Sequence, residues 1–205
     1  MAINIVAKTA ILVSGGGTNL QAIIDAKKAG KIPTAELALV ISNTPSAYAI
    51  TRAENANIPV AVICGKDFSS KKEFEEKIIS VLDENGIDFI VLAGFMSILS
   101  EDFVKHYDRR IINVHPSLIP SFCGKGFYGL KVHEAALEYG VKVTGATVHF
   151  VNEIPDGGKI IMQKAVEIME GDTPEVLQKR VMEQAEWILL PQAVECVSKK
   201  IAEEK

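Results

Sequence analysis

The chain contains little cysteine, and the cysteines it has are far apart. Only three occur among 205 residues, at Cys64, Cys123 and Cys196, and no two of them form a CxxC pair. A scattered, odd-numbered set excludes a disulfide framework and a cysteine-based metal site, so we expect reduced thiols. The sequence also lacks an apolar run of the roughly 18 residues that a membrane span needs, and its first residues lack a signal-peptide pattern. We therefore expect a cytoplasmic protein with no membrane contact.

A surplus of positive charge is missing as well. The chain has 22 Lys and Arg against 26 Asp and Glu, a formal net charge of −4. Because nucleic acids are bound by basic surfaces, this balance argues against a nucleic-acid partner. No GxSxG nucleophile motif occurs. No metal site is predicted either, since the histidines lack the short spacing of zinc ligands; they are His106, His115, His133 and His149.

What the sequence does contain is a regular alternation of apolar runs and helical patterns. Apolar runs at 10–13, 35–42, 58–63 and 88–93 predict buried strands, and helices are predicted at 46–57, 70–85 and 100–107. This alternation predicts a doubly wound, mostly parallel α/β sheet of the Rossmann-like kind. Residues 1–7 could be a short edge strand or a loose tail. No linker or repeat divides the chain, so we expect a single domain over residues 1–205.

The second half of the chain has a different pattern. Residues 143–151 and 159–168 predict two strands, plausibly paired as a hairpin, with a turn at 152–158 between them. Pro174, directly after Thr173, predicts the start of a long C-terminal helix, and Pro191 is expected to kink it. We therefore expect an antiparallel C-terminal portion and divide the domain into residues 8–110 and 111–205.

Residues 111–117, Ile-Ile-Asn-Val-His-Pro-Ser, form the most informative stretch of the sequence. The β-branched residues predict a strand that ends at Pro116, with Asn113 and His115 on the same face. Ligands of open α/β sheets bind at the carboxyl ends of strands. A carboxamide can donate to a developing oxyanion, and an imidazole can move a proton near neutral pH. A hydrogen-bonded pair that simply ends a strand fits this stretch equally well.

A glycine-rich loop, Ser14-Gly15-Gly16-Gly17-Thr18-Asn19, follows the first predicted strand and precedes a helix. Free backbone N–H groups and the helix dipole can hold an anion at such a position. The loop matches neither GxGxxG, whose third glycine would fall at Leu20, nor the lysine-containing P-loop. A tight turn with Thr18 or Asn19 as N-cap is the plainer alternative. Three glycines and two polar residues favour a phosphate site.

Two further segments have two interpretations each. Residues 121–129 are rich in glycine and aromatic residues and could be a flap over a pocket or a flexible connector. Asp156 could lie near His115, raise its pKa and so keep a proton donor available at neutral pH. Without further information, the residues alone favour an ordinary turn at Pro155-Asp156-Gly157-Gly158 as the explanation of this aspartate.

Several separate motifs, in one order along the chain, resemble the family of folate-dependent formyltransferases that act on glycinamide ribonucleotide. The resemblance extends from Ile11 to about Glu195. The motifs that carry it are residues 14–23 (SGGGTNLQAI), 92–96 (LAGFM), 112–118 (INVHPSL), 144–150 (TGATVHF) and 156–158 (DGG).

The resemblance implies roles for residues of the nucleotide side and of the catalytic centre. Gly17, Thr18 and Asn19 match the loop that binds the phosphate of the ribonucleotide, and Glu186 matches the acid that holds the ribose hydroxyls. His115 matches the catalytic histidine, and Asn113 matches the residue that steadies the formyl oxygen. Asp156 matches the aspartate that raises the pKa of that histidine. These matches make residues 8–110 the phosphate-binding half and residues 111–205 the folate and catalytic half.

The resemblance also implies a folate site. Met96, Ser97, Ile98 and Leu99 match a segment that clasps the pterin of 10-formyltetrahydrofolate, largely through backbone groups. Asn113 borders the same ligand, residues 152–156 would be the folate loop on its other side, and Lys71 is placed near the glutamate tail.

By this resemblance the expected reaction transfers a formyl group from 10-formyltetrahydrofolate to the amine of glycinamide ribonucleotide, a step of purine biosynthesis. The folate is a co-substrate, both partners are small molecules and no metal is needed. The chain would act as a monomer or a homodimer. Formyltetrahydrofolate deformylase, with water as acceptor, is the alternative. A methionyl-tRNA formyltransferase would need a second, tRNA-facing domain, and a nucleotide-sensing module would not need Asn113 and His115.

Overall fold

The computed structural model describes residues 6–205, and all statements about the structure concern these residues. The strands are β1 (Ala7–Val13), β2 (Ala35–Ser42), β3 (Val60–Val62), β4 (Phe89–Leu92), β5 (Ile111–His115), β6 (Val143–Phe150) and β7 (Ile160–Glu167). The helices are α1 (Thr18–Lys28), α2 (Tyr48–Asn55), α3 (Lys71–Glu84), α4 (Glu101–His106), α5 (Leu130–Tyr139), α6 (Pro174–Val181) and α7 (Trp187–Glu203). A 3-10 turn, Gly65–Asp67, and a π-helical turn, Met182–Glu186, complete the described elements.

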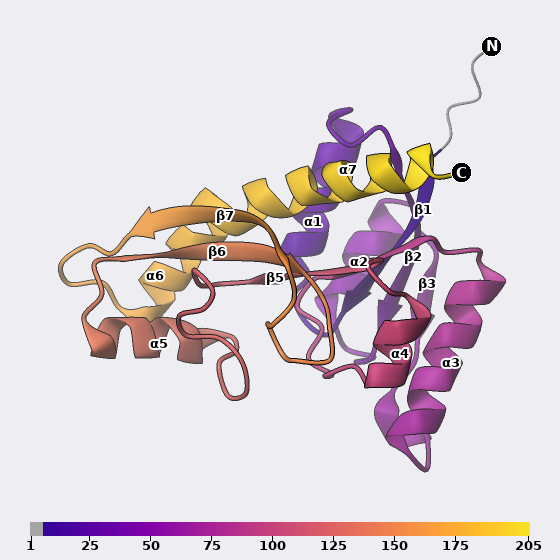
Figure 1. Cartoon of the computed structure of the whole chain (residues 1–205), viewed down its shortest axis with the longest axis horizontal. Coiled ribbons are helices and arrows are strands. Elements are labelled where there is room, and N and C mark those ends of the chain that lie inside the picture. Colours follow the sequence, from indigo (N-terminus) through magenta and orange to yellow (C-terminus); the bar gives the residue numbers. More distant parts are fainter. Residues whose placement is uncertain (1–5) are drawn as a thin grey trace.

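The strands form one seven-stranded sheet in the order β3-β2-β1-β4-β5-β6-β7 (Figure 1). Strands β1 to β5 are parallel, whereas β6 runs antiparallel to β5 and β7 antiparallel to β6. The chain moves outward from β1 to β3 and then restarts at β4 on the other side of β1. The carboxyl ends of β1 and β4 therefore mark the topological switch point, where open α/β sheets bind ligands. The predicted fold class is confirmed.

Helices cover both faces of the sheet and create two hydrophobic cores. On one face the apolar sides of α1, α2, α6 and α7 pack on residues such as Ile11, Val91 and Ile112. On the other face α3 and α4 pack through Phe74 and Phe103. Figure 1 shows α7 along one side of the sheet and α3 and α4 on the opposite side. Residues 10–13 of β1 and the whole of β4 are buried from both sides, and both are continuous apolar runs.

Most predicted boundaries agree with the structure to within two residues. Ser70, Ser100 and Thr173 cap α3, α4 and α6, each accepting a hydrogen bond from the backbone N–H three residues later. The hairpin of β6 and β7 is confirmed. Strand β1 begins at Ala7, three residues before the predicted start, because Lys8 and Thr9 pair with β2. Of the undecided N-terminal segment, residues 1–5 lie outside the described part.

The C-terminal helix contains an irregular turn that the sequence did not predict. The π-helical turn Met182–Glu186 separates α6 from α7, and α7 contains Pro191 within its length, where the kink stays a prediction. Pro191 has no N–H to give to the carbonyl of Trp187, and the irregular turn lies directly before that residue. The turn is also the segment that carries Glu186, and π-helical turns occur frequently at functional sites.

Candidate active site

A cleft of about 860 Å³ lies at the carboxyl ends of β1, β4 and β5. The loops that follow β4 and β5 line it, and so do the end of β6, the turn after β6 and the π-helical turn before α7. Its wall contains Asn19 and Glu186, the three residues Asn113, His115 and Asp156, and the segment from Met96 to Leu99. Most of the residues singled out by sequence therefore share one cavity.

Asn113 and His115 reach the cleft because β5 ends there. Both side chains point to one face of the strand, as its period of two requires. Antiparallel pairing places His149 of β6 directly opposite Asn113, and the Asn113 amide nitrogen lies 3.4 Å from His149 Nε2. Since His149 Nδ1 lies 2.8 Å from the carbonyl oxygen of Phe150 and donates to it, the neutral ring has a lone pair on Nε2 that can accept from Asn113.

His115 is held between two acceptors. Its Nε2–H donates to the carbonyl oxygen of Phe122 at 2.9 Å, and its Nδ1 lies 3.5 Å from Asp156 Oδ2. Phe122 and Asp156 both have positive φ, at 49° and 56°. Such backbone is uncommon outside glycine, and it concentrates at functional sites. An imidazolium at this position would have a partner for each of its two N–H groups.

Asp156 joins the two histidines of the cleft. Its Oδ1 lies 3.6 Å from His149 Nε2, and its Oδ2 accepts a hydrogen bond of 2.9 Å from the backbone N–H of Gly124. Gly158 fixes the turn that carries Asp156, because a Cβ there would lie 1.7 Å from the carbonyl oxygen of Phe150. The turn can therefore approach the end of β6 closely only with glycine at this position. The alternative that Asp156 is only a turn residue does not account for these contacts.

Burial changes the pKa of His115 more than the neighbouring groups do. Desolvation lowers the pKa of His115 below that of an ordinary imidazole, and the charge of Asp156 and the Phe122 carbonyl only partly oppose it. The expected rise in this pKa is therefore wrong for the net value, although Asp156 acts in the expected direction. Burial raises the pKa of Asp156, but the neighbouring His149 and His115 and the backbone N–H of Gly124 outweigh it and hold that pKa below its usual value. The free site thus favours a neutral His115 beside an ionised Asp156.

Sequence reasoning gave no role to two histidines that belong to this site. His149 is buried, and only the register between β5 and β6 brings it to Asn113. His133 of α5 also borders the cleft; burial, and to a smaller extent the charge of His115, lowers the pKa of His133 to about 4. The sequence predicts a strand over residues 143–151, but pairing across a sheet is not visible in a single sequence.

The glycine loop is held by α2, and the helix that follows it faces the cleft through Asn19. The carbonyls of Gly15 and Gly17 accept from the backbone N–H groups of Ala49 and Gln21, at 3.1 and 2.9 Å. Gly17 has φ 71°, and a Cβ there would lie 2.7 Å from that of Ala49, so only glycine fits.

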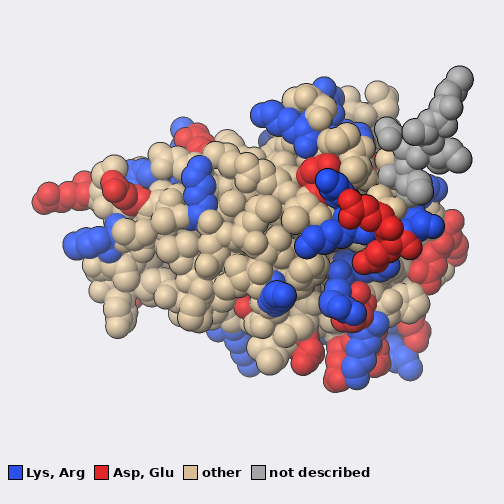
Figure 2. Space-filling model, turned by 45° about the horizontal axis from the view of Figure 1, so that its top comes forward, with Lys and Arg blue, Asp and Glu red and all other residues tan. Residues whose placement is uncertain are grey.

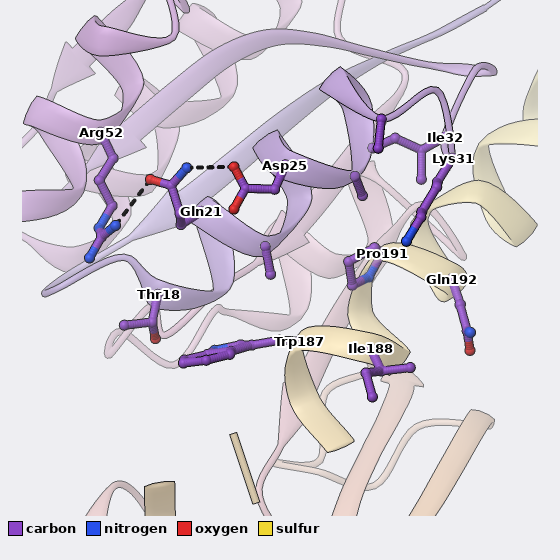
Figure 3. Close-up of a pocket in the computed structure, with 13 residues that line it drawn as sticks. Thr18, Gln21, Asp25, Lys31, Ile32, Arg52, Trp187, Ile188, Pro191 and Gln192 are labelled. Atoms are coloured by element: carbon purple, nitrogen blue, oxygen red, sulfur yellow. Dashed lines mark hydrogen bonds between the residues drawn. The ribbon is translucent and has the colours of Figure 1, made fainter. Parts of the chain in front are cut away.

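Asn19 connects the loop to the π-helical turn. The amide of Asn19 donates to Glu186 Oε2 at 2.7 Å, while its own Oδ1 is buried without a partner. Burial raises the pKa of Glu186, with the Asn19 hydrogen bond opposing. Thr18 instead lines a separate groove of about 570 Å³ between α1 and α7 (Figure 3).

The segment from Met96 to Leu99 forms an apolar rim of the cleft. The side chains of Met96 and Ile98 are 57% and 61% exposed, and Ile154 on the facing turn is 59% exposed. Large apolar side chains at the edge of a cavity suit a flat, partly apolar ligand. Ser14 Oγ accepts from the N–H of Met96 at 2.8 Å, which ties this rim to the glycine loop. Ser97 Oγ accepts from the Asn43 amide at 3.0 Å.

Lys71 does not line the cleft. It lies in the first turn of α3, its side chain is 56% exposed, and its Nζ is 3.6 Å from Glu75 Oε1. Glu75 Oε1 in turn accepts from the N–H of Ser100 at 2.9 Å, so Lys71 lies near the end of the 96–99 segment rather than in the cavity. Its place near a folate tail stays a prediction.

Residues 124–129 line the cleft, and their position favours a wall over a simple connector. Phe122 and Gly124, just before and within this segment, contact His115 and Asp156 through their backbone.

Among residues 6–205 no group of three or more His, Cys, Asp or Glu side chains is arranged to hold a metal ion. No helix in the same range is long and apolar enough to cross a membrane. On the face drawn in Figure 2, basic and acidic residues are intermixed.

Residues 7–194 match the family model described as formyl transferase. The chain belongs to the formyl transferase family. This formyl transferase is 45% identical over 177 residues to the phosphoribosylglycinamide formyltransferase of Haemophilus influenzae, a match that covers 86% of this chain and 81% of the relative. It is 47% identical over 193 residues to the trifunctional purine biosynthetic protein adenosine-3 of Gallus gallus. That match covers 93% of this formyl transferase but only 18% of the trifunctional protein's length.

Solved structures agree with the family assignment. Glycinamide ribonucleotide transformylase 1 of Symbiobacterium toebii matches this formyl transferase with a TM-score of 0.89 and 37% identity, covering 95% of this chain and 89% of its own. A formyltetrahydrofolate deformylase of Pseudomonas putida matches with a TM-score of 0.81 and 30% identity, covering 95% of this chain and 66% of its own. The deformylase is thus the more distant of the two structures.

Proposed function

We propose that this formyl transferase moves the formyl group of 10-formyltetrahydrofolate to the amine of glycinamide ribonucleotide in purine biosynthesis. The observation that carries the proposal is the convergence of Asn113, His115 and Asp156 in one cleft. Asn19, Glu186 and the apolar rim from Met96 to Leu99 line the same cleft. The relatives named as phosphoribosylglycinamide or glycinamide ribonucleotide enzymes support this choice of acceptor.

The proposed positions of the two substrates follow from the chemistry of the cleft. The phosphate binds at the N-terminus of α1, to the backbone N–H groups of Gly17, Thr18 and Asn19, where the helix dipole favours an anion. Glu186, buried and next to Asn19, accepts hydrogen bonds from the ribose hydroxyls. The pterin lies against Met96 to Leu99 and the turn at 152–156, and the formyl group reaches Asn113 and His115.

In the proposed mechanism the amine of the ribonucleotide attacks the formyl carbon, and the negative charge on the formyl oxygen is stabilised by the amide N–H of Asn113. The attacking nitrogen then carries a surplus proton, which His115 accepts. His115 returns that proton to the folate nitrogen as the bond between it and the former formyl carbon breaks, so atoms and charge balance. His115 Nε2 can accept that proton only in the tautomer whose ring hydrogen is on Nδ1, facing Asp156, and only when Nε2 no longer faces the Phe122 carbonyl.

The protonation states of the free site support this cycle. A buried neutral imidazole can accept the proton, and Asp156 stabilises the imidazolium that forms for a short time. Asp156 itself stays ionised because its pKa is held low. The residues therefore suit a proton shuttle between two nitrogens, and no covalent intermediate on the enzyme is required.

Deformylase activity is the second candidate, supported by the structural similarity to the Pseudomonas putida enzyme. An assay of folate release in the presence of ribonucleotide, of formylatable methionyl-tRNA or of buffer alone separates the acceptors. We expect turnover with the ribonucleotide only. Release of tetrahydrofolate in buffer at the same rate would favour the deformylase and overturn the proposal.

The remaining partner and location statements belong to the same proposal. The partners are two small molecules, nucleic acid has no part in the reaction, and the chain acts in the cytoplasm as a monomer or homodimer. The free state of all three cysteines supports a reducing compartment. Sedimentation of the purified chain over a concentration series determines which oligomer it forms.

A further inference from the structure

Helix α2 holds the glycine loop from the side away from the cleft. The backbone N–H of Ala49 donates to the carbonyl of Gly15 at 3.1 Å, and Arg52 Nε donates to the carbonyl of Gly16 at 2.8 Å. The carbonyl of Gly17 accepts from the backbone N–H of Gln21 at 2.9 Å. Three successive loop carbonyls are therefore occupied, and Arg52 supplies the one bond among them that comes from a side chain.

Arg52 is itself fixed by a chain of side chains along α1. Its Nη1 donates to Gln21 Oε1 at 3.0 Å, and Gln21 Nε2 donates to Asp25 Oδ1 at 2.9 Å. Figure 3 shows Arg52, Gln21 and Asp25 in this sequence along the groove between α1 and α7. The guanidinium carbon lies 5.0 Å from the centre of the Tyr48 ring, a cation–π distance. The guanidinium is thus oriented from three directions.

The geometry of the peptide bond connects Arg52 to the loop amide. In a trans peptide the carbonyl of one residue and the N–H of the next point in opposite directions. When Arg52 holds the Gly16 carbonyl, it therefore also fixes the direction of the Gly17 N–H. A charged donor on a carbonyl polarises the whole amide, which makes its N–H a stronger donor.

We propose that Arg52 is a positioning residue for the phosphate-monoester site: it orients and strengthens the Gly17 N–H without touching the phosphate. This inference rests on the proposed function, since it assumes that the loop binds the phosphate of the ribonucleotide.

The test compares Arg52→Gln and Arg52→Lys with the unchanged protein, using glycinamide ribonucleotide and its dephosphorylated riboside as acceptors. We expect Arg52→Gln to lower kcat/KM for the ribonucleotide roughly tenfold, the size of one lost hydrogen bond to a charged group. The loss should appear in KM, whereas kcat, the KM for the folate and kcat/KM for the riboside stay unchanged. The inhibition constant of inorganic phosphate should rise by a similar factor. Arg52→Lys keeps the charge but not the fork of donors, so it should recover only part of the loss.

Arg109→Gln is the matched control. Its side chain is 84% exposed, its Nε lies 3.2 Å from Asp108, and it precedes β5 at the opposite end of the sheet. The Arg109→Gln variant removes one positive charge without touching the loop. Its kcat and KM for both acceptors should therefore equal those of the unchanged protein. A nonspecific charge effect would weaken phosphate binding in both glutamine variants and would overturn the inference.

The outcomes separate the inference from the function beneath it. If Arg52→Gln lowers kcat/KM equally for ribonucleotide and riboside, or lowers neither, Arg52 is not a positioning residue for the phosphate. If the unchanged protein forms no product with the ribonucleotide while Arg52→Gln still weakens binding of inorganic phosphate in calorimetry, the proposed function fails but the role of Arg52 stands. Thermal unfolding of each variant shows whether a loss comes from misfolding, and Arg52→Lys supplies a folded comparison.

Discussion

Replacement of Asp156 by asparagine is the perturbation for which the structure gives the most detailed expectation. Asparagine keeps the size of the side chain, can still accept from the Gly124 N–H and tolerates the positive φ of this position. It removes only the negative charge that lies 3.5 Å from His115 Nδ1. The variant therefore separates the charge of Asp156 from its place in the turn.

The magnitude follows from that distance. Two unit charges about 4 Å apart attract by about 4 kcal/mol at an effective dielectric constant of about 20. Burial already favours neutral His115, and Asp156 is the largest influence that opposes it. Without the carboxylate the pKa of His115 should fall further, and the imidazolium formed during transfer should lose its main stabilisation. We expect kcat to fall about 10²–10⁴-fold, the range for loss of acid–base assistance, with little change in the binding of either substrate.

Two measurements on the same samples check this expectation. Steady-state turnover at saturating ribonucleotide and formyl folate gives kcat, and NMR titration of the imidazole Cε1 proton of His115 gives its pKa. Asp108→Asn is the control, because Asp108 is 72% exposed and pairs with Arg109 outside the cleft. Near-normal turnover together with an unchanged His115 titration would refute the reasoning and leave Asp156 as a turn residue only.

Three further perturbations have equally specific outcomes. Gly17→Val should weaken ribonucleotide binding by roughly tenfold or more while formyl-folate binding is kept, since a Cβ clashes with Ala49 and blocks the approach of the anion; equal losses in calorimetry would mean a purely structural loop. Glu186→Gln should raise the melting temperature by an amount that grows as pH rises from the unfolded-state pKa of Glu186 through its folded-state pKa and then levels off, because burial raises the folded-state pKa and the wild-type fold loses stability over that interval. The same variant should lose ribose binding, and a stability difference independent of pH would contradict the argument. Full activity should survive EDTA, whereas a strict need for a divalent ion would contradict the proposed chemistry.

Local patterns in the sequence were sufficient to predict most of the fold. The caps at Ser70, Ser100 and Thr173 depend on residues three positions apart, and the buried strands on continuous apolar runs, so neighbouring residues determine both. The π-helical turn before α7 was not predicted, because a proline shows which hydrogen bond is lost but not where a helix becomes irregular.

The site was predicted less completely, for a physical reason. Asn113 and His115 are two residues apart, so their common face follows from strand geometry alone. His149 joins them only through strand pairing, and Asp156 only through a tight turn that needs Gly158. The pKa of His115 depends on burial by the whole fold, which outweighs the one charge that the sequence suggested.

The most direct test of the central claim follows the formyl carbon itself. The purified chain is mixed with 10-formyltetrahydrofolate labelled with ¹³C in the formyl group, with and without glycinamide ribonucleotide, and carbon NMR records where the label goes. The proposed function predicts that the label appears in the formamide of the ribonucleotide, at a rate that depends on His115, and that little label is released when the acceptor is absent. Label that accumulates as free formate at the same rate in both samples would contradict it.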